Sequence, residues 1–266
     1  MVIPIYNPCM AYAPRALEGS LRALATKYPI VTVTGPRQSG KSTLCRHVFA
    51  DKPYINLEAL DQRAFARDDP RGFLASVAEG AILDEVQHAP ELLSYLQVEV
   101  DERPRPGRFI LSGSQHLGLT QAVTQSLAGR TAMLYLLPMS SRELRSFGGP
   151  RSLSATLWSG GYPAIFDRGI AADRWLTDYA TTYVQRDVRQ VQNVQDLDAF
   201  TRFVRLCAGR TGSELNLSTL GADAGITHNT ARAWLSILEA TFICMRLPAW
   251  HRNIRKQLVK APKLHF

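Results

Sequence analysis

Residues 35–43 read GPRQSGKST, and this stretch decides the fold. It fits the pattern G-x-x-x-x-G-K-[ST] of the phosphate-binding loop, whose backbone N–H groups surround the phosphates of a nucleotide. A β-branched run, IVTVT at residues 30–34, precedes the loop, and a helical pattern over residues 41–49 follows it. Because the motif requires a strand before it and a helix after it, the sequence predicts a P-loop domain.

Each position of this loop has a predicted role in holding ATP and its magnesium ion. The glycines permit the tight backbone, the Lys41 ammonium reaches the β- and γ-phosphates, and the Ser42 hydroxyl binds Mg²⁺. Thr43 adds donors near the α-phosphate. The predicted ATP-binding residues are Gly35, Pro36, Arg37, Gln38, Ser39, Gly40, Lys41, Ser42 and Thr43.

An acidic pair, Asp84 and Glu85, follows a short apolar run at residues 81–83. At the end of a buried strand, Asp84 would hold Mg²⁺ together with Ser42, and Glu85 would orient and deprotonate the attacking water. A later predicted strand at residues 108–111 runs into polar residues. We predict that Ser114, or alternatively Ser112, is a sensor that contacts the γ-phosphate or the water.

Arg130 ends a helical pattern just before a predicted strand at residues 131–137. In ring-forming ATPases an arginine near this place projects to the γ-phosphate of the neighbouring subunit and neutralises charge there. Arg130 is therefore either an arginine finger in a homo-oligomer or a solvated or structural arginine. As a finger it would join Glu85, Lys41 and Ser114 among the catalytic residues.

The first half of the chain alternates short apolar runs with helical patterns, which predicts a parallel α/β sheet. The expected fold is the three-layer sheet of P-loop NTPases, AAA-like, with an additional strand and a catalytic glutamate, followed by a helical and winged-helix region. Glycine-rich stretches suggest an ATPase domain over residues 1–150 and a helical linker or lid over 151–200. A basic winged-helix region and the start of a further domain would occupy residues 201–266. The predicted strands cover residues 30–34, 54–57, 81–83, 108–111 and 131–137.

Most of the net charge of +8 comes from the last quarter of the chain. Residues 201–266 carry 10 Lys and Arg against 3 Asp and Glu, a net charge of +7, and residues 1–200 account for the remaining +1. Such asymmetry indicates either a polyanionic partner or a solvated basic surface.

Residues 217–241 have the pattern of two helices joined by a glycine-containing turn, a helix-turn-helix. The exposed face of the second helix is predicted to carry residues of types that contact bases or phosphates, namely His228, Asn229, Thr230 and Arg232. DNA binding through residues 217–241 and the basic segment 250–263 is one interpretation. A lid or a protein contact is the other.

Several classes of protein do not fit this sequence. No apolar run reaches the roughly 18 residues that span a bilayer, and the start MVIPIYNPCM lacks the basic region of a signal peptide. The four cysteines form no CxxC pair, which argues against a zinc site and suits a reducing compartment. These features predict a cytoplasmic protein.

The motifs together resemble those of prokaryotic AAA-type ATPases that carry a C-terminal domain of unknown function. The resemblance rests on GPRQSGKSTL, LDEVQ, ILSGSQ, SLAGR, GGYP, YVQRDV and GITHNTARAWLSILEAT. It implies an ATPase core, a winged-helix region and a third domain similar to restriction endonucleases. It places Arg186 in a typical motif but gives it no role. Because members of the group continue past KLHF, the chain is expected to be truncated before the third domain is complete.

The function expected from the sequence is Mg²⁺-dependent ATP hydrolysis, coupled to a partner through the basic C-terminal region. One alternative is an ATP-dependent DNA-binding regulator with little turnover. The other is a protein-interaction switch that does not bind DNA.

Overall fold

The computed structural model describes residues 12–114, 123, 126–183, 194, 196–250, 252–253 and 260–266. The chain divides into two compact units, Met1–Leu176 and Thr177–Phe266. The domain boundaries at residues 150 and 200 stay a prediction. Within the described part of the chain, no helix is both long enough and apolar enough to cross a membrane.

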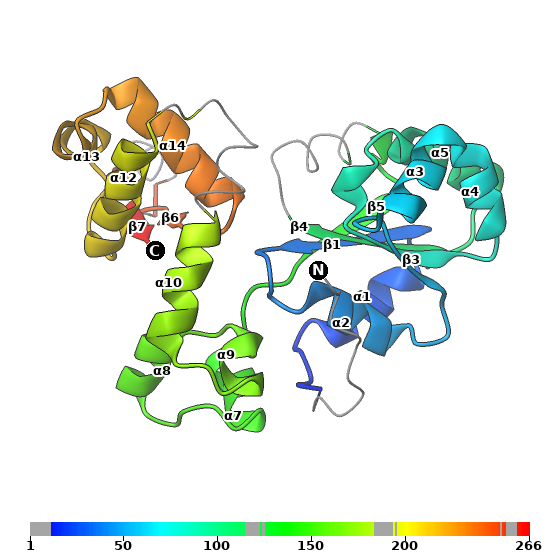
Figure 1. Cartoon of the computed structure of the whole chain (residues 1–266), viewed down its shortest axis with the longest axis horizontal. Helices are drawn as coiled ribbons and strands as arrows, with labels where there is room; N and C mark the ends of the chain where they lie inside the picture. Colours follow the sequence, from blue (N-terminus) through cyan, green and yellow to red (C-terminus); the bar gives the residue numbers. More distant parts are fainter. Residues whose placement is uncertain are drawn as a thin grey trace. The chain divides into compact units, whose positions relative to one another are not determined.

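In the first unit, five strands among the described residues form one parallel sheet (Figure 1). Their order across the sheet is β2-β3-β4-β1-β5. The fourth strand in the sequence therefore lies between the strand that enters the P-loop and the strand that ends at Asp84. This arrangement confirms the predicted α/β class with an additional strand. The strands are β1 Ile30–Gly35, β2 Tyr54–Asn56, β3 Ala81–Asp84, β4 Phe109–Ser114 and β5 Thr131–Tyr135.

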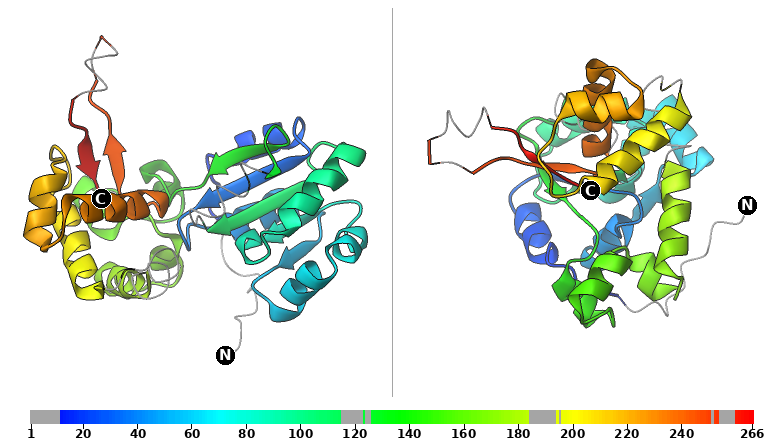
Figure 2. Two further views of the ribbon diagram at one scale, coloured as in Figure 1. Left: turned by 90° about the horizontal axis from the view of Figure 1, so that it is seen from above. Right: turned by 90° about the vertical axis from the view of Figure 1, so that its left-hand side faces the viewer.

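Helices cover both faces of this sheet (Figure 2). Helices α1 (Glu18–Ala25) and α2 (Lys41–Val48) cover one face, and α3 (Leu60–Asp68), α4 (Pro70–Ser76) and α5 (Leu92–Glu102) cover the other. Successive residues of a strand point to opposite faces, so a strand that is buried on both faces is apolar throughout. That is why such short runs were recognisable as strands in the sequence.

The strand register brings the functional motifs to one edge of the sheet. Gly35 pairs with Ser114, and Leu83 pairs with Leu111. Strands β1, β4 and β3 therefore end side by side. A short 3₁₀ helix, η1 (Val86–His88), follows β3 directly.

Short helices follow β5 within the first unit. Helix α7 (Ser141–Ser146) begins with a capping box formed by Ser140 and Glu143. Helices α8 (Leu153–Ser159) and α9 (Pro163–Asp167) come next, and α10 (Ala172–Tyr183) begins in the first unit and ends in the second. Gly161, before α9, lies against the segment after β5: its carbonyl accepts from the Met139 N–H at 2.7 Å, and a Cβ atom there would lie 2.3 Å from the Met139 carbonyl oxygen.

After the end of α10, the described residues of the second unit form three helices and a two-stranded hairpin. They are α12 (Leu197–Gly209), α13 (Leu217–Ala224), α14 (His228–Ala240), β6 (Met245–Leu247) and β7 (Lys263–His265). An antiparallel bridge also joins Glu214, which precedes α13, to Lys263.

The predicted helix pair is present in this unit. Thr227 caps α14 by accepting a hydrogen bond from the Thr230 N–H at 3.1 Å. The apolar face of α14 is buried, and Trp234 contacts Phe200 with ring centroids 5.1 Å apart. Arg186 lies outside the described residues, as do parts of the basic segment 250–263.

Candidate functional site

The P-loop adopts a backbone that requires glycine at its two ends. A Cβ atom at Gly35 would lie 2.2 Å from the Leu136 carbonyl oxygen. Gly40 precedes α2 with a φ of 95°, in the left-handed region that glycine adopts without steric cost. Gln38 also has a positive φ, of 60°. The loop is therefore a tight turn with left-handed backbone at Gln38 and Gly40, directly before the helix begins.

Lys41 is buried within this loop. Its ammonium donates hydrogen bonds to the carbonyl oxygens of Gly35 at 3.1 Å and Pro36 at 2.7 Å. Burial lowers the pKa of Lys41, although the nearby carboxylates of Glu85 and Asp84 act in the opposite direction. The loop thus holds a partly desolvated cation at the start of α2, where the helix dipole also favours an anion.

Asp84 accepts hydrogen bonds from two neighbouring strands. The Ser112 hydroxyl on β4 donates to Oδ1, and the Tyr54 hydroxyl on β2 donates to Oδ2 at 2.5 Å. The Tyr54 hydroxyl also lies near Ser42, the other predicted magnesium ligand. Burial and the charge of Asp84 raise the pKa of Tyr54, which therefore stays protonated. Sequence reasoning identified this tyrosine only as part of a predicted strand.

Glu85 lies in the left-handed region with a φ of 55°, an uncommon conformation for a residue other than glycine. Its Oε2 accepts a hydrogen bond from the Gln87 side-chain amide and one from the Ser114 hydroxyl at 3.4 Å. The same amide donates to the Ser114 hydroxyl at 3.1 Å. Glu85, Gln87 and Ser114 thus form one cluster. Strained backbone of this kind is often found at functional sites.

The two candidate sensor serines therefore contact different acids. Ser112 bonds to Asp84, and Ser114 bonds to Glu85. Sequence reasoning left Gln87 without a role, although it is the last residue of the quoted motif LDEVQ. Only the turn of η1 brings its side chain back to Glu85.

Buried polar atoms around the loop indicate that a polar ligand belongs here. Thr34 Oγ1, Ser39 Oγ and Gln87 Oε1 have no hydrogen-bond partner among the described residues. Buried polar groups normally have partners, so their clustering around one loop is informative. The Ser42 hydroxyl and the Asp84 carboxylate are oxygen donors of the kind that Mg²⁺ prefers. The residues present therefore fit a nucleotide phosphate with a magnesium ion.

Arg130 lies at the amino ends of the strands, opposite the end of the sheet that carries the P-loop. It directly precedes β5, and its guanidinium donates to both carboxylate oxygens of Asp101 at 2.6 and 2.7 Å. The structure does not bring Arg130 to the P-loop of its own chain. Its predicted role as an arginine finger toward another subunit stays a prediction.

Comparisons with known families agree with this geometry. Residues 27–145 match the model of the AAA domain family. The first unit therefore has the α/β fold of P-loop NTPases, and these residues of it match the AAA domain family. Residues 150–266 match a domain of unknown function (DUF8612), which covers the segment predicted as linker and winged-helix region. The predicted restriction-endonuclease-like third domain stays a prediction.

Similar proteins extend the comparison beyond the AAA domain. Two uncharacterized proteins, from Mycobacterium bovis and Mycobacterium tuberculosis, are each 30% identical over 264 residues, which is 97% of this chain and 58% of theirs. The chain thus spans 58% of the length of these relatives. A Walker-type ATPase of Pyrococcus abyssi matches with a TM-score of 0.59 and 16% identity, covering 88% of this chain and 91% of that one. At this identity the match supports the fold alone.

Proposed function

We propose that the chain binds Mg·ATP and hydrolyses it by attack of a water molecule on the γ-phosphorus. The observation that carries this proposal is the cluster of Glu85, Gln87 and Ser114. Ser114 ends β4, and β4 lies beside β1, the strand that leads into the P-loop and Lys41. A loop that only binds phosphate needs no carboxylate held beside it. A carboxylate with fixed hydrogen-bond donors is the group that water activation requires.

Binding relies on the P-loop backbone and Lys41. The Lys41 ammonium now donates to two loop carbonyls and would exchange them for phosphate oxygens when ATP enters. Ser42 and Asp84 would hold the metal ion, and the Tyr54 hydroxyl keeps the Asp84 carboxylate in place. The metal ion, once bound, neutralises charge on the phosphate oxygens.

Hydrolysis relies on Glu85. Its carboxylate accepts a proton from the water as the oxygen forms a bond to the γ-phosphorus, and the bond to the bridging β–γ oxygen breaks. ADP and inorganic phosphate leave, and the proton returns to solvent. Gln87 and Ser114 restrict Glu85 to one orientation, which lowers the cost of reaching the attack geometry.

A steady-state ATPase assay tests the proposal. Glu85→Gln should lower turnover by about a hundredfold or more, the usual scale of a general base, and should leave ATP affinity within about twofold of the parent value, because Glu85 does not touch the phosphates before attack. Glu79→Gln is the matched control, because Glu79 is an exposed glutamate paired with Arg105 in the same domain. Equal turnover in the parent and Glu85→Gln would remove Glu85 from the mechanism.

A second function, DNA binding, is favoured by the arrangement of the second unit. We infer that this unit is a winged helix, because α12, the bridge at Glu214, α13, α14 and the hairpin follow the order of that fold. Three polar residues on the outer face of α14 are exposed, namely Asn229, Arg232 and Ser236. Their chemistry suits phosphates and base edges.

Salt-dependent binding to duplex DNA separates the possible roles of this unit. Phosphate contacts release counterions, so affinity should fall steeply between low and moderate salt. DNA that also stimulates ATP turnover would support coupled hydrolysis, whereas binding without stimulation would support a regulator with little turnover. If no DNA binds at low salt, the alternative of a protein partner gains support.

Arg130 and homo-oligomerisation form a separate part of the proposal. An arginine finger acts on the nucleotide of a neighbouring subunit, so turnover per chain should rise with protein concentration. Arg130→Ala should remove that rise. Asp101→Ala frees Arg130 from its present ion pair and should not lower turnover.

A further inference from the structure

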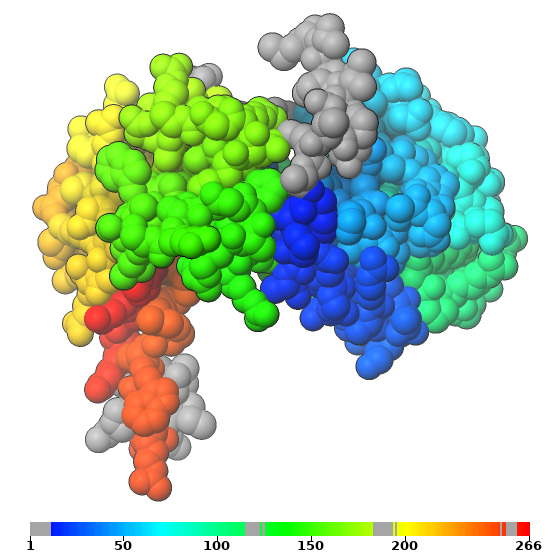
Figure 3. All heavy atoms as spheres, turned by 90° about the horizontal axis from the view of Figure 1, so that it is seen from below, coloured from blue at the N-terminus to red at the C-terminus, as the bar shows by residue number. Residues whose placement is uncertain are grey.

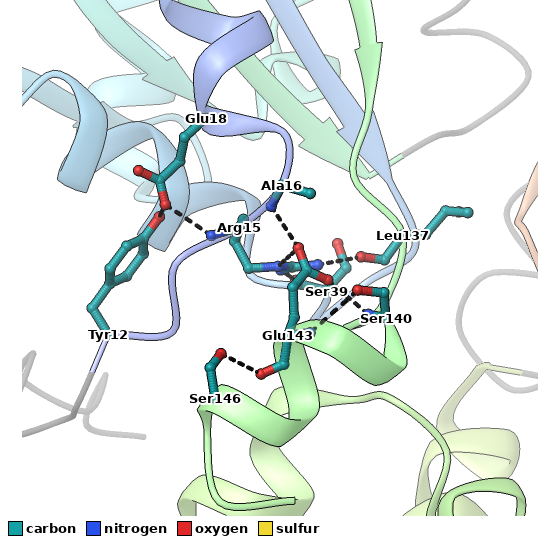
Figure 4. Close-up of polar contacts among 9 residues, drawn as sticks. All are labelled: Tyr12, Arg15, Ala16, Glu18, Ser39, Leu137, Ser140, Glu143 and Ser146. Carbon is teal, nitrogen blue, oxygen red and sulfur yellow. Dashed lines mark hydrogen bonds and ion pairs between the residues drawn. The ribbon is translucent and has the colours of Figure 1, made fainter. Parts of the chain in front are cut away.

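Arg15, in the segment before α1, connects three parts of the ATPase domain that are far apart in the sequence (Figure 4). Its Nη1 donates to the carbonyl of Ser39 in the P-loop at 2.8 Å, and its Nη2 donates to the carbonyl of Leu137 after β5 at 2.7 Å. Its Nε donates to Glu143 Oε1 on α7 at 3.1 Å. The side chain is only 5% exposed, so the surrounding segments are in close contact with it.

Glu143 is held as firmly as the arginine. Its Oε1 also accepts from the Ala16 N–H at 2.7 Å, and its Oε2 accepts from the Ser140 N–H at 2.7 Å. Burial raises the pKa of Glu143, but these hydrogen bonds and the charge of Arg15 outweigh that effect and leave its pKa below the ordinary value. In Figure 3 the N-terminal segment, in blue, lies beside the green segment that follows β5. The contact is therefore an ionised pair inside the domain.

The bond from Arg15 to Ser39 determines the orientation of one peptide of the loop. In a planar trans peptide the C=O and the following N–H point in opposite directions. Because the Ser39 carbonyl points to the guanidinium, the Gly40 N–H points away from Arg15. The N–H groups of this motif are the ones that bind phosphate oxygens. A Cβ atom at Gly40 would lie 3.4 Å from Arg15 Nη1, so the guanidinium lies directly against the loop.

We propose that Arg15 is a positioning residue for the nucleotide. It fixes the peptide between Ser39 and Gly40 in the orientation that phosphate binding needs, and it joins this peptide to α7 through Glu143. ATP binding and the arrangement of residues 137–143 are therefore coupled. This inference rests on the proposed ATP binding and extends it to a residue outside the recognised motifs.

A second buried arginine of the same domain provides a matched control. Arg108 donates to Glu99 Oε1 at 2.5 Å, to the Ala78 carbonyl at 2.9 Å and to the Glu99 carbonyl at 3.2 Å. Its side chain is 1% exposed. It precedes β4, at the amino ends of the strands, whereas the P-loop follows the carboxyl end of β1. Both arginines thus bond to a glutamate and to backbone carbonyls, but only Arg15 bonds to the P-loop.

The experiment compares Arg15→Lys with Arg108→Lys in the full chain. Lysine keeps the charge but cannot bridge three acceptors as the guanidinium does, so both variants should lose thermal stability to a similar extent. Only Arg15→Lys should raise the Kd for Mg·ATP, by about tenfold, the scale of one charge-assisted hydrogen bond. Arg108→Lys should change it by less than about twofold.

The possible outcomes separate this inference from the proposed function. If the parent chain does not bind Mg·ATP, ATP binding itself is wrong. If the parent binds it and the two lysine variants bind it equally well, Arg15 is merely structural and the inference is overturned. If Arg15→Lys does not fold, the double variant Arg15→Met with Glu143→Gln removes both buried charges together, and it should still bind ATP about tenfold more weakly.

Hydrogen exchange on the unmodified chain tests the coupling without any variant. The Ala16 and Ser140 amides donate to Glu143, so their exchange should slow when Mg·ATP is added. The Gly72 amide, which donates to Asp69 at the start of α4, is the control and should not change. Unchanged exchange at Ala16 and Ser140 in the ATP-bound chain would overturn the coupling.

Discussion

The carboxyl-end edge of the sheet and the outer face of α14 are both rich in polar residues, but they are built differently. At the sheet edge Lys41, Asp84 and Ser114 are buried, and each has hydrogen-bond partners on neighbouring segments. On α14 the side chains of Asn229 and Arg232 are exposed. The first region fixes its groups before any ligand arrives, whereas the second presents them to solvent.

This difference indicates what each region can do. Activation of a water molecule depends on groups held in one geometry, and such groups must be surrounded by partners. Contact with a long polyanion draws on many exposed charges, each of which contributes little. Substitutions at the sheet edge should therefore have large effects on chemistry, and those on α14 should have small effects confined to binding.

The largest effect is expected at Lys41. Lys41→Met removes the ammonium and keeps an apolar stem, so it should weaken Mg·ATP binding by a hundredfold or more, about the loss of two charge-assisted hydrogen bonds at roughly 1.5–3 kcal/mol each. Burial lowers the pKa of Lys41, so the charged form is disfavoured in the fold and its removal should not lower the melting temperature. Calorimetric titration and thermal unfolding measure both quantities. Lys27→Met, at an exposed position, should leave both unchanged.

A second prediction concerns acid stability and the buried Glu143. Its folded-state pKa lies below the unfolded value of about 4.3, so its contribution to stability is present above that pH and is lost as pH falls through the folded pKa. Glu143→Gln should lower the free energy of unfolding by about 1–3 kcal/mol at pH 7, the scale of hydrogen bonds to a charged group. The difference from the parent chain should shrink in acid.

Denaturant unfolding at pH 7 and at a series of pH values below about 4, down through the folded pKa, measures this difference. Glu214→Gln is the control in the second unit, since the Glu214 side chain is exposed, and it should shift the free energy by no more than about 0.5 kcal/mol. A gap between the parent chain and Glu143→Gln that stays constant with pH would mean that the charge of Glu143 does not stabilise the fold.

The sequence predicted those parts of the site that lie next to each other along the chain. The P-loop and the pair of Asp84 and Glu85 were visible because their spacing follows from local geometry, a strand followed by a turn and a helix. Strands were recognisable because both faces of the sheet are buried. The helix pair of the second unit was visible from its glycine-containing turn between two helical patterns.

The residues that sequence reasoning missed act across long separations. Arg15 lies 24 positions from Ser39 and 128 from Glu143, and Tyr54 lies 30 positions from Asp84. Only the order of strands in the sheet brings Tyr54 to Asp84, and short local patterns do not determine that order. Gln87 is close in sequence, but its contact with Glu85 depends on the left-handed backbone at Glu85, which no motif required.

A third prediction separates the two serines of β4. Ser114→Ala removes a contact of Glu85 and should lower turnover by about tenfold without changing ATP affinity, the scale of one hydrogen bond at about 1–1.5 kcal/mol. Ser112→Ala removes a contact of Asp84 and should instead raise the magnesium concentration needed for half-maximal turnover. Titration of magnesium in the ATPase assay distinguishes them. The reverse pattern would exchange the two assignments.

The smallest effect is expected on α14. Arg232→Ala should weaken binding to duplex DNA about threefold at low salt and reduce the salt slope by about 0.9, the value for one phosphate contact. Its melting temperature should match the parent chain, because the side chain is exposed. Fluorescence anisotropy at several salt concentrations measures the DNA affinity and its salt slope.

Arg205→Ala is the matched control for that experiment, because it removes the same charge from an exposed position on α12. If the outer face of α14 contacts DNA, Arg205→Ala should retain the parent salt slope. If the two variants weaken binding equally, the attraction comes from the net charge of the unit and not from α14. In that case the outer face of α14 would have no specific contact with DNA, unlike the sheet edge with its proposed Mg·ATP. The expected partner of the second unit would then shift from DNA to protein.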